Sequence, residues 1–334
     1  MGQTISRRRF IQTTAATVGG LSIPWALHGF QGSGLERVRF GLCADPHQDV
    51  MHDGAARLSA FIDRAKLEKV DFIIQLGDFC RPYSHNLGFM KVWESFDGPR
   101  YHVIGNHDTD GGFSREQVLE YWQMPARFYT FDRGGFHFIV LDGNDVIAHR
   151  SPGYPRALAA DQIEWLKADL ASCDQPAIIF SHQSLEDFHG VENGTEVRRV
   201  LEAANEAAGY RKVVACLSGH HHIDYHRKLG GIDYLQVNSM SYYWLGSKHL
   251  HLRYDQEVDR EFPYIKYTAP YRDSLFAIVT LEAQGSMTIE GLSSEFVGPS
   301  PWELGFRRSD WRDRVVPRIR DRQLRFGVGV AGDR

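Results

Sequence analysis

The chain has 334 residues, of which 43% are hydrophobic and 24% are charged, and its formal net charge is −4. This composition is typical of a globular protein with a sizeable core and argues against a disordered chain. The slightly acidic balance, with no long basic block before residue 299, gives no indication of a nucleic-acid-binding protein.

The N-terminal segment is similar to an export signal. Residues 6–12 read Ser-Arg-Arg-Arg-Phe-Ile-Gln, which resembles the twin-arginine motif, and an uncharged stretch follows over residues 13–27. That stretch is too short and too weakly apolar for a stable membrane span. We therefore expect residues 1–32 to be a signal segment, with the twin-arginine export machinery as a partner and a periplasmic or extracellular location. A disordered basic tail or an uncleaved anchor is the alternative interpretation.

The rest of the chain alternates strand and helix patterns. Short apolar runs predict strands, and apolar residues at helical spacing predict helices between them. Pairs of glycines at residues 134–135 and 230–231 predict two β-hairpins. The predicted helices lie near residues 58–65, 163–170 and 196–208, and the predicted strands are residues 37–43, 71–76, 101–104, 128–133, 136–141, 177–180, 212–217, 225–229, 232–237, 274–281 and 287–289. This alternation indicates an α/β fold, and the hairpins indicate mixed sheets.

Three segments follow from this pass along the chain. Residues 1–32 are the expected signal segment, residues 35–298 the expected domain, and residues 299–334 an arginine-rich tail that we expect to cross the surface. Residues 241–272 lack clear periodicity. A loop of that length in a compact domain is usually functional or an insertion, so we expect it to border the functional site.

Five short segments rich in metal-ligating side chains each follow a predicted strand. They are Asp45-Pro46-His47, Gly77-Asp78, Gly105-Asn106-His107-Asp108, Ser181-His182 and Gly219-His220-His221-His222. In open α/β sheets the ligand crevice forms at the carboxyl ends of the strands, so we expect these segments to meet. Carboxylate, amide oxygen and imidazole together suit manganese, iron or zinc. The spacing of each Asp-x-His or His-x-His pair predicts two side chains on the same side of an extended turn, and the preceding glycines permit tight turns.

In this order the five segments resemble the calcineurin-like metallophosphoesterases, whose pattern is D-x-H, G-D, G-N-H-D/E, a lone H, and G-H-x-H. The resemblance spans residues 40–238 and implies a four-layer α-β-β-α sandwich of two mixed sheets flanked by helices. It implies two metal ions that share Asp78 as a bridge. The first would be held by Asp45, His47, Asp78 and His222, and the second by Asp78, Asn106, His182 and His220. It further implies that His107 is the acid near the leaving group and that Asp108 orients it.

The resemblance implies hydrolysis of a small-molecule phosphate ester, either a monoester or a diester, by a water molecule activated between two cations. Residues 136–142 and 162–166 look like the cyclic-nucleotide phosphodiesterase and ADP-ribose/CDP-alcohol diphosphatase branches, so a nucleotide pyrophosphatase or cyclic-nucleotide phosphodiesterase is an alternative. A non-catalytic scaffold of the same fold is an alternative of another class, although no expected ligand is missing.

Four further residues are candidates for substrate binding. Arg81 takes the place of the tyrosine that purple acid phosphatases carry three residues after the Gly-Asp aspartate, so that subgroup is not expected. A guanidinium group suits a phosphate, and a surface salt bridge is the alternative for this residue. Tyr242, Tyr243 and Trp244 follow a predicted strand and could stack on a nucleobase or aryl group, with ordinary packing as the alternative.

Overall fold

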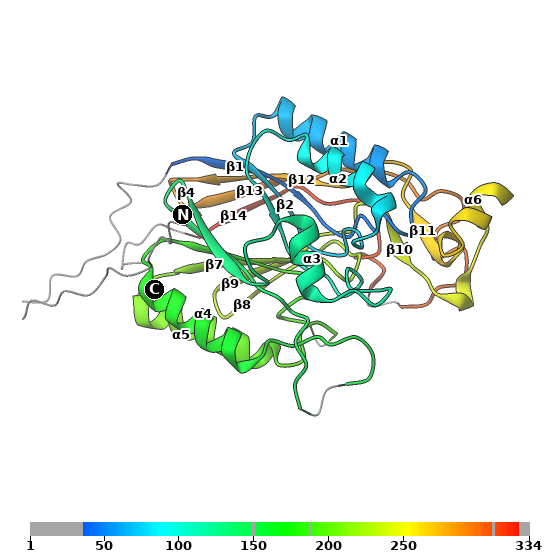
Figure 1. Cartoon of the computed structure of the whole chain (residues 1–334). Coiled ribbons are helices and arrows are strands. Elements are labelled where there is room, and N and C mark those ends of the chain that lie inside the picture. The colour runs from blue at the N-terminus through cyan, green and yellow to red at the C-terminus, as the bar shows by residue number, and fades with distance from the viewer. Residues whose placement is uncertain (1–35, 149–150, 188, 309–310, 327–334) are drawn as a thin grey trace, which may run out of the picture.

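A computed structural model of the chain describes residues 36–148, 151–187, 189–308 and 311–326 (Figure 1). The expected signal segment, residues 1–32, lies outside this part of the chain. Across the described ranges, no helix is both long and apolar enough to cross a membrane.

Two mixed sheets, each with six strands within the described residues, lie face to face. The order of the first sheet is β14-β13-β12-β1-β2-β3, and that of the second is β4-β5-β6-β7-β9-β8. The first comprises β1 (Val38–Cys43), β2 (Phe72–Gln75), β3 (Arg100–His102), β12 (Ala277–Glu282), β13 (Ser286–Glu290) and β14 (Arg322–Arg325). The second comprises β4 (Tyr129–Arg133), β5 (Phe136–Val140), β6 (Ala177–Ser181), β7 (Val213–Ser218), β8 (Tyr225–Leu229) and β9 (Ile232–Gln236). Strands β1, β2 and β3 are parallel, as are β5, β6, β7 and β9, so each sheet has one edge at which several carboxyl ends meet.

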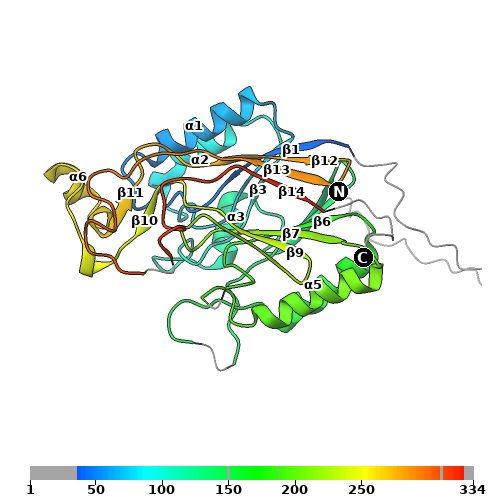
Figure 2. The ribbon, with the colours of Figure 1, turned by 180° about the vertical axis from the view of Figure 1, so that it is seen from behind.

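Helices cover the outer faces of both sheets, as Figures 1 and 2 show. Helices α1 (Gly54–Leu67) and α2 (Leu87–Glu94) lie over the first sheet, and α4 (Ala160–Ser172) and α5 (Gly194–Ala208) over the second. The expected four-layer α-β-β-α sandwich is therefore confirmed. Helices α2 and α3 (Arg115–Trp122) were not among the predicted elements; α3 begins with a capping box between Ser114 and Gln117.

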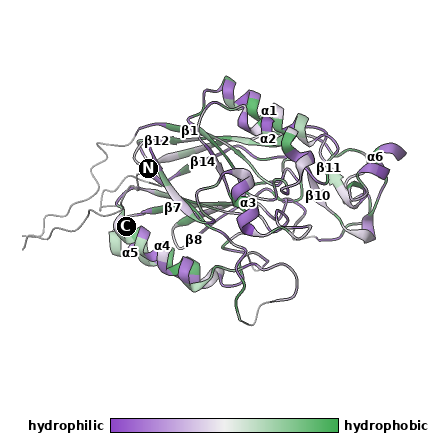
Figure 3. Cartoon of the chain, in the orientation of Figure 1, coloured by the Kyte–Doolittle hydropathy of each residue, from purple (hydrophilic) through white to green (hydrophobic). Residues whose placement is uncertain are grey.

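The strand pattern explains why two apolar layers form. In β5 and the residue after it, Phe138 and Val140 belong to the cluster between the sheets, whereas Ile139 and Leu141 pack toward α4 and α5. Successive strand residues point to opposite faces, so a strand buried on both sides reads as one apolar run. Across the sheets, the ring of Phe40 lies 6.0 Å from that of Phe138 between centroids. Figure 3 shows these strands largely in the hydrophobic colour and the outer helices in both colours.

Residues 241–272 are not a structureless loop. They contain β10 (Tyr242–Trp244), which pairs antiparallel with β11 (Thr268–Pro270), and the short helix α6 (Gln256–Glu261) between them. Both strands and α6 lie beyond the end of the sandwich where the carboxyl ends of the parallel strands point (Figures 1 and 2). The 3-10 turns of the described chain are η1 (Ser84–Asn86), η2 (Ser247–His249) and η3 (Ile265–Tyr267).

The C-terminal segment differs from the tail that the sequence predicts for residues 299–334. Its described part adds β14 to the edge of the first sheet, where it pairs with β13. Trp311 and Val315 are buried against Tyr243 in a separate apolar cluster. The arginine-rich composition masks these widely spaced apolar anchors, so residue 298 does not mark the end of the folded domain.

Candidate active site

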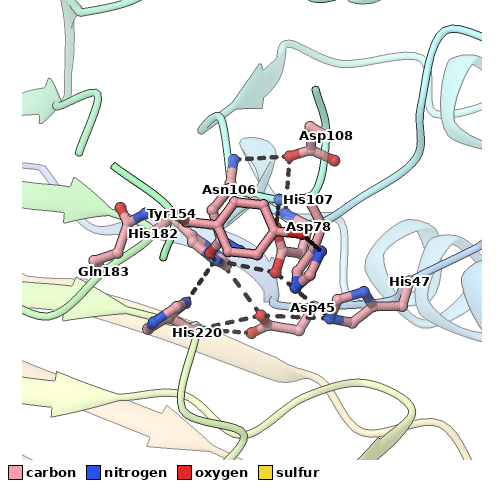
Figure 4. Close-up of polar contacts among 12 residues, drawn as sticks. Asp45, His47, Asp78, Asn106, His107, Asp108, Tyr154, His182, Gln183 and His220 are labelled. Atoms are coloured by element: carbon pink, nitrogen blue, oxygen red, sulfur yellow. Dashed lines mark hydrogen bonds and ion pairs between the residues drawn. The ribbon is translucent and has the colours of Figure 1, made fainter. Parts of the chain in front are cut away.

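All seven predicted ligand side chains converge at the carboxyl ends of the parallel strands. Figure 4 labels all of them except His222. The donor atoms form two groups, within each of which all atoms lie within 4.8 Å of one another: Asp45, His47 and His222, and Asp78, His182 and His220. The amide oxygen of Asn106 joins the second group, 3.1 Å from His182 Nε2. Oxygen Oδ2 of Asp78 lies 3.5 Å from His47 Nε2 and 3.2 Å from His182 Nε2, between the two groups.

The backbone at these ligands is not the extended turn that the spacing predicts. Asp45 and His47 both have φ near 49°, Asp78 has φ 51°, and His220 and His222 have φ 71° and 52°. Non-glycine residues adopt this left-handed conformation uncommonly, at an energetic cost that the surrounding structure must offset. Its concentration at the ligands indicates that the loops are held in place for the site.

Three glycines allow these loops to pack together. A Cβ on Gly77, whose φ is 94°, would lie 2.5 Å from His182 Nδ1. A Cβ on Gly105 would lie 2.2 Å from the backbone nitrogen of Asp78, and one on Gly219 would lie 2.5 Å from Asp45 Oδ2. Only the first of the three needs a positive φ. The other two are required by the close approach of neighbouring ligands rather than by a turn.

Hydrogen bonds to backbone carbonyls fix how two of the imidazoles face the site. Nδ1 of His182 lies 2.8 Å from the carbonyl oxygen of Leu76, and Nδ1 of His222 lies 2.8 Å from that of Tyr242. A carbonyl only accepts, so Nδ1 carries a proton in each ring and Nε2 is the nitrogen that points to the other ligand atoms. Nε2 of His222 lies 3.1 Å from Nε2 of His47, so two ring nitrogens converge on one point.

The charges of the cluster also favour a bound cation. Burial holds the pKa of His47 and of His220 well below the usual value, so both rings are neutral and can act as ligands. For His182, burial acts to lower the pKa, but the carboxylates of Asp78 and Asp45 outweigh it and raise the pKa to about 9. The buried carboxylates of Asp78 and Asp45 thus keep a proton on His182, at a position where a metal ion could bind. Neutral imidazoles, carboxylates and an amide oxygen fit two ions of manganese, iron or zinc.

His107 lies beside the ligands but in neither group. Its backbone nitrogen donates to Asp78 Oδ1 at 2.8 Å, and its ring Nδ1 lies 2.7 Å from Asp110 Oδ2. The hydroxyl of Tyr154 donates to Asp110 at 3.0 Å. It also lies 3.2 Å from the same ring nitrogen of His107, and Figure 4 labels both of these residues. Burial acts to lower the pKa of His107, but Asp78 and Asp110 outweigh it and raise the pKa. The ring therefore holds a proton, with Nε2 left to face the cleft.

The expectation that Asp108 orients His107 was wrong. The carboxylate of Asp108 instead accepts from the backbone nitrogens of Asp78 at 2.9 Å, Phe79 at 2.7 Å and Gly105 at 2.7 Å. It therefore ties together the loops that follow β2 and β3 and positions Asp78. Asp110 makes the contact with His107, and no pattern in the sequence indicates it beyond its position three residues later.

A cleft with two connected cavities opens above the ligands. One has a volume of about 500 Å³ and is lined by Arg81 and by Tyr242 and Trp244 from β10. Arg81 is paired with Asp49, whose Oδ2 lies 3.3 Å from Nε. Tyr242 is buried and its ring lies 5.1 Å from that of His47, whereas Trp244 is 46% exposed. Tyr243 faces the other way and lines the second cavity, of about 290 Å³.

The other lining residues that sequence reasoning missed come from irregular segments. The first cavity also contains Tyr154 and Tyr264, and the second contains His189, Arg308 and Trp311. None of these lies in a strand or an α-helix. Strand periodicity therefore could not bring them to the site, and the pairing of β10 with β11 could not be predicted either.

Comparisons with known proteins agree with this geometry. The family model described as calcineurin-like phosphoesterase matches residues 38–224. The manganese-dependent ADP-ribose/CDP-alcohol diphosphatase of Arabidopsis thaliana is 26% identical over an alignment that covers 45% of this chain and 64% of that protein. The chain thus spans about two thirds of the length of that relative.

Two solved structures have the same fold at low sequence identity. A dimetal phosphatase from Danio rerio superposes with a TM-score of 0.57 at 18% identity, over 78% of this chain and 98% of that one. GAP50, the anchor in the inner membrane complex of Plasmodium, superposes with a TM-score of 0.50 at 15% identity, over 88% and 90%. At these identities the likeness concerns the fold alone.

Proposed function

This chain belongs to the calcineurin-like phosphoesterase family, and we propose that it is a two-metal hydrolase of phosphate esters. One observation carries the proposal: seven ligand-type side chains from both sheets meet around Asp78, beside a histidine that belongs to neither ligand group. One ion would be held by Asp45, His47, Asp78 and His222, and the other by Asp78, Asn106, His182 and His220.

When bound, two such cations supply Lewis-acid stabilisation of phosphate charge and a water molecule with a pKa near neutrality. The chain itself supplies the positions of the ligands. Asp108 holds the loops of Asp78 and Gly105 through three backbone hydrogen bonds. The carbonyls of Leu76 and Tyr242 hold the rings of His182 and His222 in one tautomer.

His107 is the proposed general acid. Asp110 engages Nδ1 of its ring, so Nε2 is the nitrogen that can donate a proton to the leaving oxygen. Asp78 and Asp110 raise the pKa of His107 against the effect of burial, which favours the protonated form of the ring. Tyr154 donates to Asp110 and fixes the orientation of that carboxylate.

The side chains at the rim of the cleft would determine which phosphate esters bind. Arg81 lines the first cavity, but its guanidinium is shared with Asp49, which lowers its value as a phosphate contact. Trp244 borders both cavities and offers an exposed ring on which a nucleobase or aryl group can stack. Tyr242 is buried beneath the ligands and acts through packing on His47.

A second candidate activity is the hydrolysis of a diphosphate bond. The observation that favours it is the similarity to the manganese-dependent ADP-ribose/CDP-alcohol diphosphatase. A non-catalytic scaffold is the weaker alternative, because the ligand set and His107 are complete.

A panel of three substrates tests the activity. Protein loaded with manganese is incubated with p-nitrophenyl phosphate, bis-p-nitrophenyl phosphate and ADP-ribose, with His182→Gln as the control. We expect metal-dependent hydrolysis of at least one of them by the wild type only. Wild-type protein that carries two manganese ions per chain and cleaves none of the three would overturn the proposal.

We also propose that the protein is exported by the twin-arginine machinery, which the motif over residues 6–12 supports. Residues 1–35 fused to a folded reporter should carry it across the inner membrane of a bacterium that has this machinery. The pair Arg7→Lys and Arg8→Lys should retain the reporter inside. Export of both fusions at the same rate, or of neither, would contradict this proposal.

A further inference from the structure

The two cavities of the cleft lie on either side of a shared floor. His47, Asp78, His107, Tyr242 and Trp244 line both of them. We call the larger cavity, of about 500 Å³, the first lobe, and the smaller, of about 290 Å³, the second lobe. A phosphate held at the floor would therefore have room for a substituent on each side.

The two lobes differ in charge. Outside the floor, the first lobe is lined by the carboxylates of Asp49, Asp108 and Asp110, and its guanidinium, Arg81, is paired with Asp49. Outside the floor, none of the described residues that line the second lobe carries a carboxylate. They include four histidines and Arg308. An anionic group is therefore favoured in the second lobe and repelled from the first.

Arg308 is held in place in the second lobe. Its guanidinium carbon lies 3.7 Å from the centroid of the Trp311 ring, which is a close cation–π contact. Trp311 is only 6% exposed and is packed in a cluster with Tyr243 and Val315, so the platform beneath the guanidinium is fixed. Arg308 is half-buried, and no carboxylate within the described ranges forms an ion pair with it. Its hydrogen-bond donors make no ion pair to the described residues and can therefore serve a ligand in the second lobe.

The lobes also differ in what they offer to a ring. Tyr154 and Tyr264 give the first lobe two exposed aromatic side chains of its own, at 44% and 57% exposure, beside the shared ring of Trp244. Such side chains stack on nucleobases and other flat groups. The larger lobe thus suits the ring-bearing part of a substrate, and the smaller lobe suits a compact anion.

From this difference we propose that the second lobe is a binding site for a second phosphate group of the substrate, with Arg308 as its main contact. The inference rests on the proposed function and narrows it to organic diphosphates, in which one phosphate lies at the floor and the next in the second lobe. A planar guanidinium is suited to paired hydrogen bonds with phosphate oxygens. Arg308 is thus a specificity-determining residue that binds substrate without touching the reacting bond.

The test compares Arg308→Met with Arg312→Met. Methionine keeps the length of the side chain and removes the charge. Arg312 is the matched control because it also lies over a tryptophan, 5.7 Å from the ring centroid of Trp302, but lines neither lobe. We expect Arg308→Met to lower kcat/KM for ADP-ribose by about 10- to 100-fold, the loss typical of one hydrogen bond to a charged group. The loss for p-nitrophenyl phosphate should be at least about tenfold smaller, and Arg312→Met should change neither.

A binding measurement separates this inference from the proposed function. Calorimetry with α,β-methylene-ADP, whose diphosphate is not cleaved, should give a Kd about 10-fold or more higher for Arg308→Met, with a much smaller change for AMP. If the wild type hydrolyses nothing, the proposed function fails. This binding comparison still tests whether the second lobe binds a second phosphate group. Equal losses on both ligands, or no loss on either, would overturn the assignment of Arg308.

Discussion

Two buried histidines, His182 and His137, lie at opposite ends of the parallel strands of the second sheet. At the carboxyl end of β6, His182 gives its Nδ1 proton to the carbonyl of Leu76, and its Nε2 lies 3.2 Å from Asp78. At the amino end of β5, both ring nitrogens of His137 contact carboxylates, Nδ1 at 2.6 Å from Asp132 and Nε2 at 2.9 Å from Asp169.

A ligand histidine is recognised by the partner of its second ring nitrogen. Contact with an aspartate is common to both residues, so it does not distinguish them. A carbonyl on one nitrogen of His182 leaves the other nitrogen as an electron-pair donor, in the company of other donors. At His137 both ring nitrogens instead face carboxylates, so both carry a proton and neither has a lone pair left for a metal. The pKa of His137 is raised accordingly, because the hydrogen bonds to Asp169 and Asp132 outweigh the burial that acts to lower it.

Replacing His182 or His137 with glutamine should give the largest contrast in the rate of hydrolysis. We expect His182→Gln to reduce metal-dependent hydrolysis by more than about 100-fold, because even groups that only orient a ligand cost 10- to 100-fold. His137→Gln should leave hydrolysis intact, since it lies at the other end of the sheet. Steady-state rates at saturating manganese measure both. Comparable losses in the two variants would mean that His182 acts through stability rather than through metal binding.

Replacement of His107 tests the chemistry apart from the metals. His107→Ala should retain both metal ions and lower kcat by about 10²- to 10⁴-fold, the usual worth of general acid catalysis. The loss should be largest for alkyl esters, whose alkoxide needs a proton, and smaller for nitrophenyl esters, which leave as anions. Equal losses on both classes, with intact metal content, would argue that His107 positions the phosphate instead.

Asp110 should have a smaller effect that depends on His107. We expect Asp110→Asn to lower kcat by about 10- to 100-fold, because it removes the charge that orients and stabilises the imidazolium of His107. The change should be in kcat rather than KM, and it should nearly vanish in a His107→Ala background. A full loss in that background would show that Asp110 acts on the substrate or metals directly.

The smallest expected effect is on stability at the other end of the sheet. A histidine whose pKa is raised by folding stabilises the protein fully below its unfolded pKa of about 6.5 and loses that contribution as the pH rises through the folded value. His137→Gln should therefore lower the free energy of unfolding by about 1 kcal/mol at pH 6 and by less at pH 9. Urea titrations of both proteins at the two pH values measure this. An identical difference at both would contradict the ion-pair account.

The ligand end of the two sheets was predictable because most of the ligands closely follow a buried strand. Apolar runs located β1, β2, β6 and β7, and parallel strands of an α/β sheet present their carboxyl ends at one edge. The order of layers also followed, since strands and helices alternate in the sequence. Even so, the left-handed backbone of Asp45 and His47 was not foreseen, because side-chain spacing alone does not report φ.

The rest of the site could not be derived because it depends on irregular segments. Asp110 and Tyr154 reach His107 from loops, and Arg308 and Trp311 reach the cleft from a segment that reads as a polar tail. Such contacts are set by tertiary packing rather than by periodicity. The helix between β2 and β3 was missed for a related reason, since its eight residues, Leu87–Glu94, are too short for a clear helical period.

The metal content of Asp78→Asn is the most direct measurement of whether two metal ions share Asp78. Oδ2 of Asp78 lies within 3.5 Å of His47 in one ligand group and 3.2 Å of His182 in the other. Elemental analysis of protein equilibrated with manganese and then desalted should give two ions per chain for the wild type. Asp78→Asn should lose both, since each site loses a charged ligand. Two ions per chain in the variant, or fewer than two in the wild type, would contradict the account.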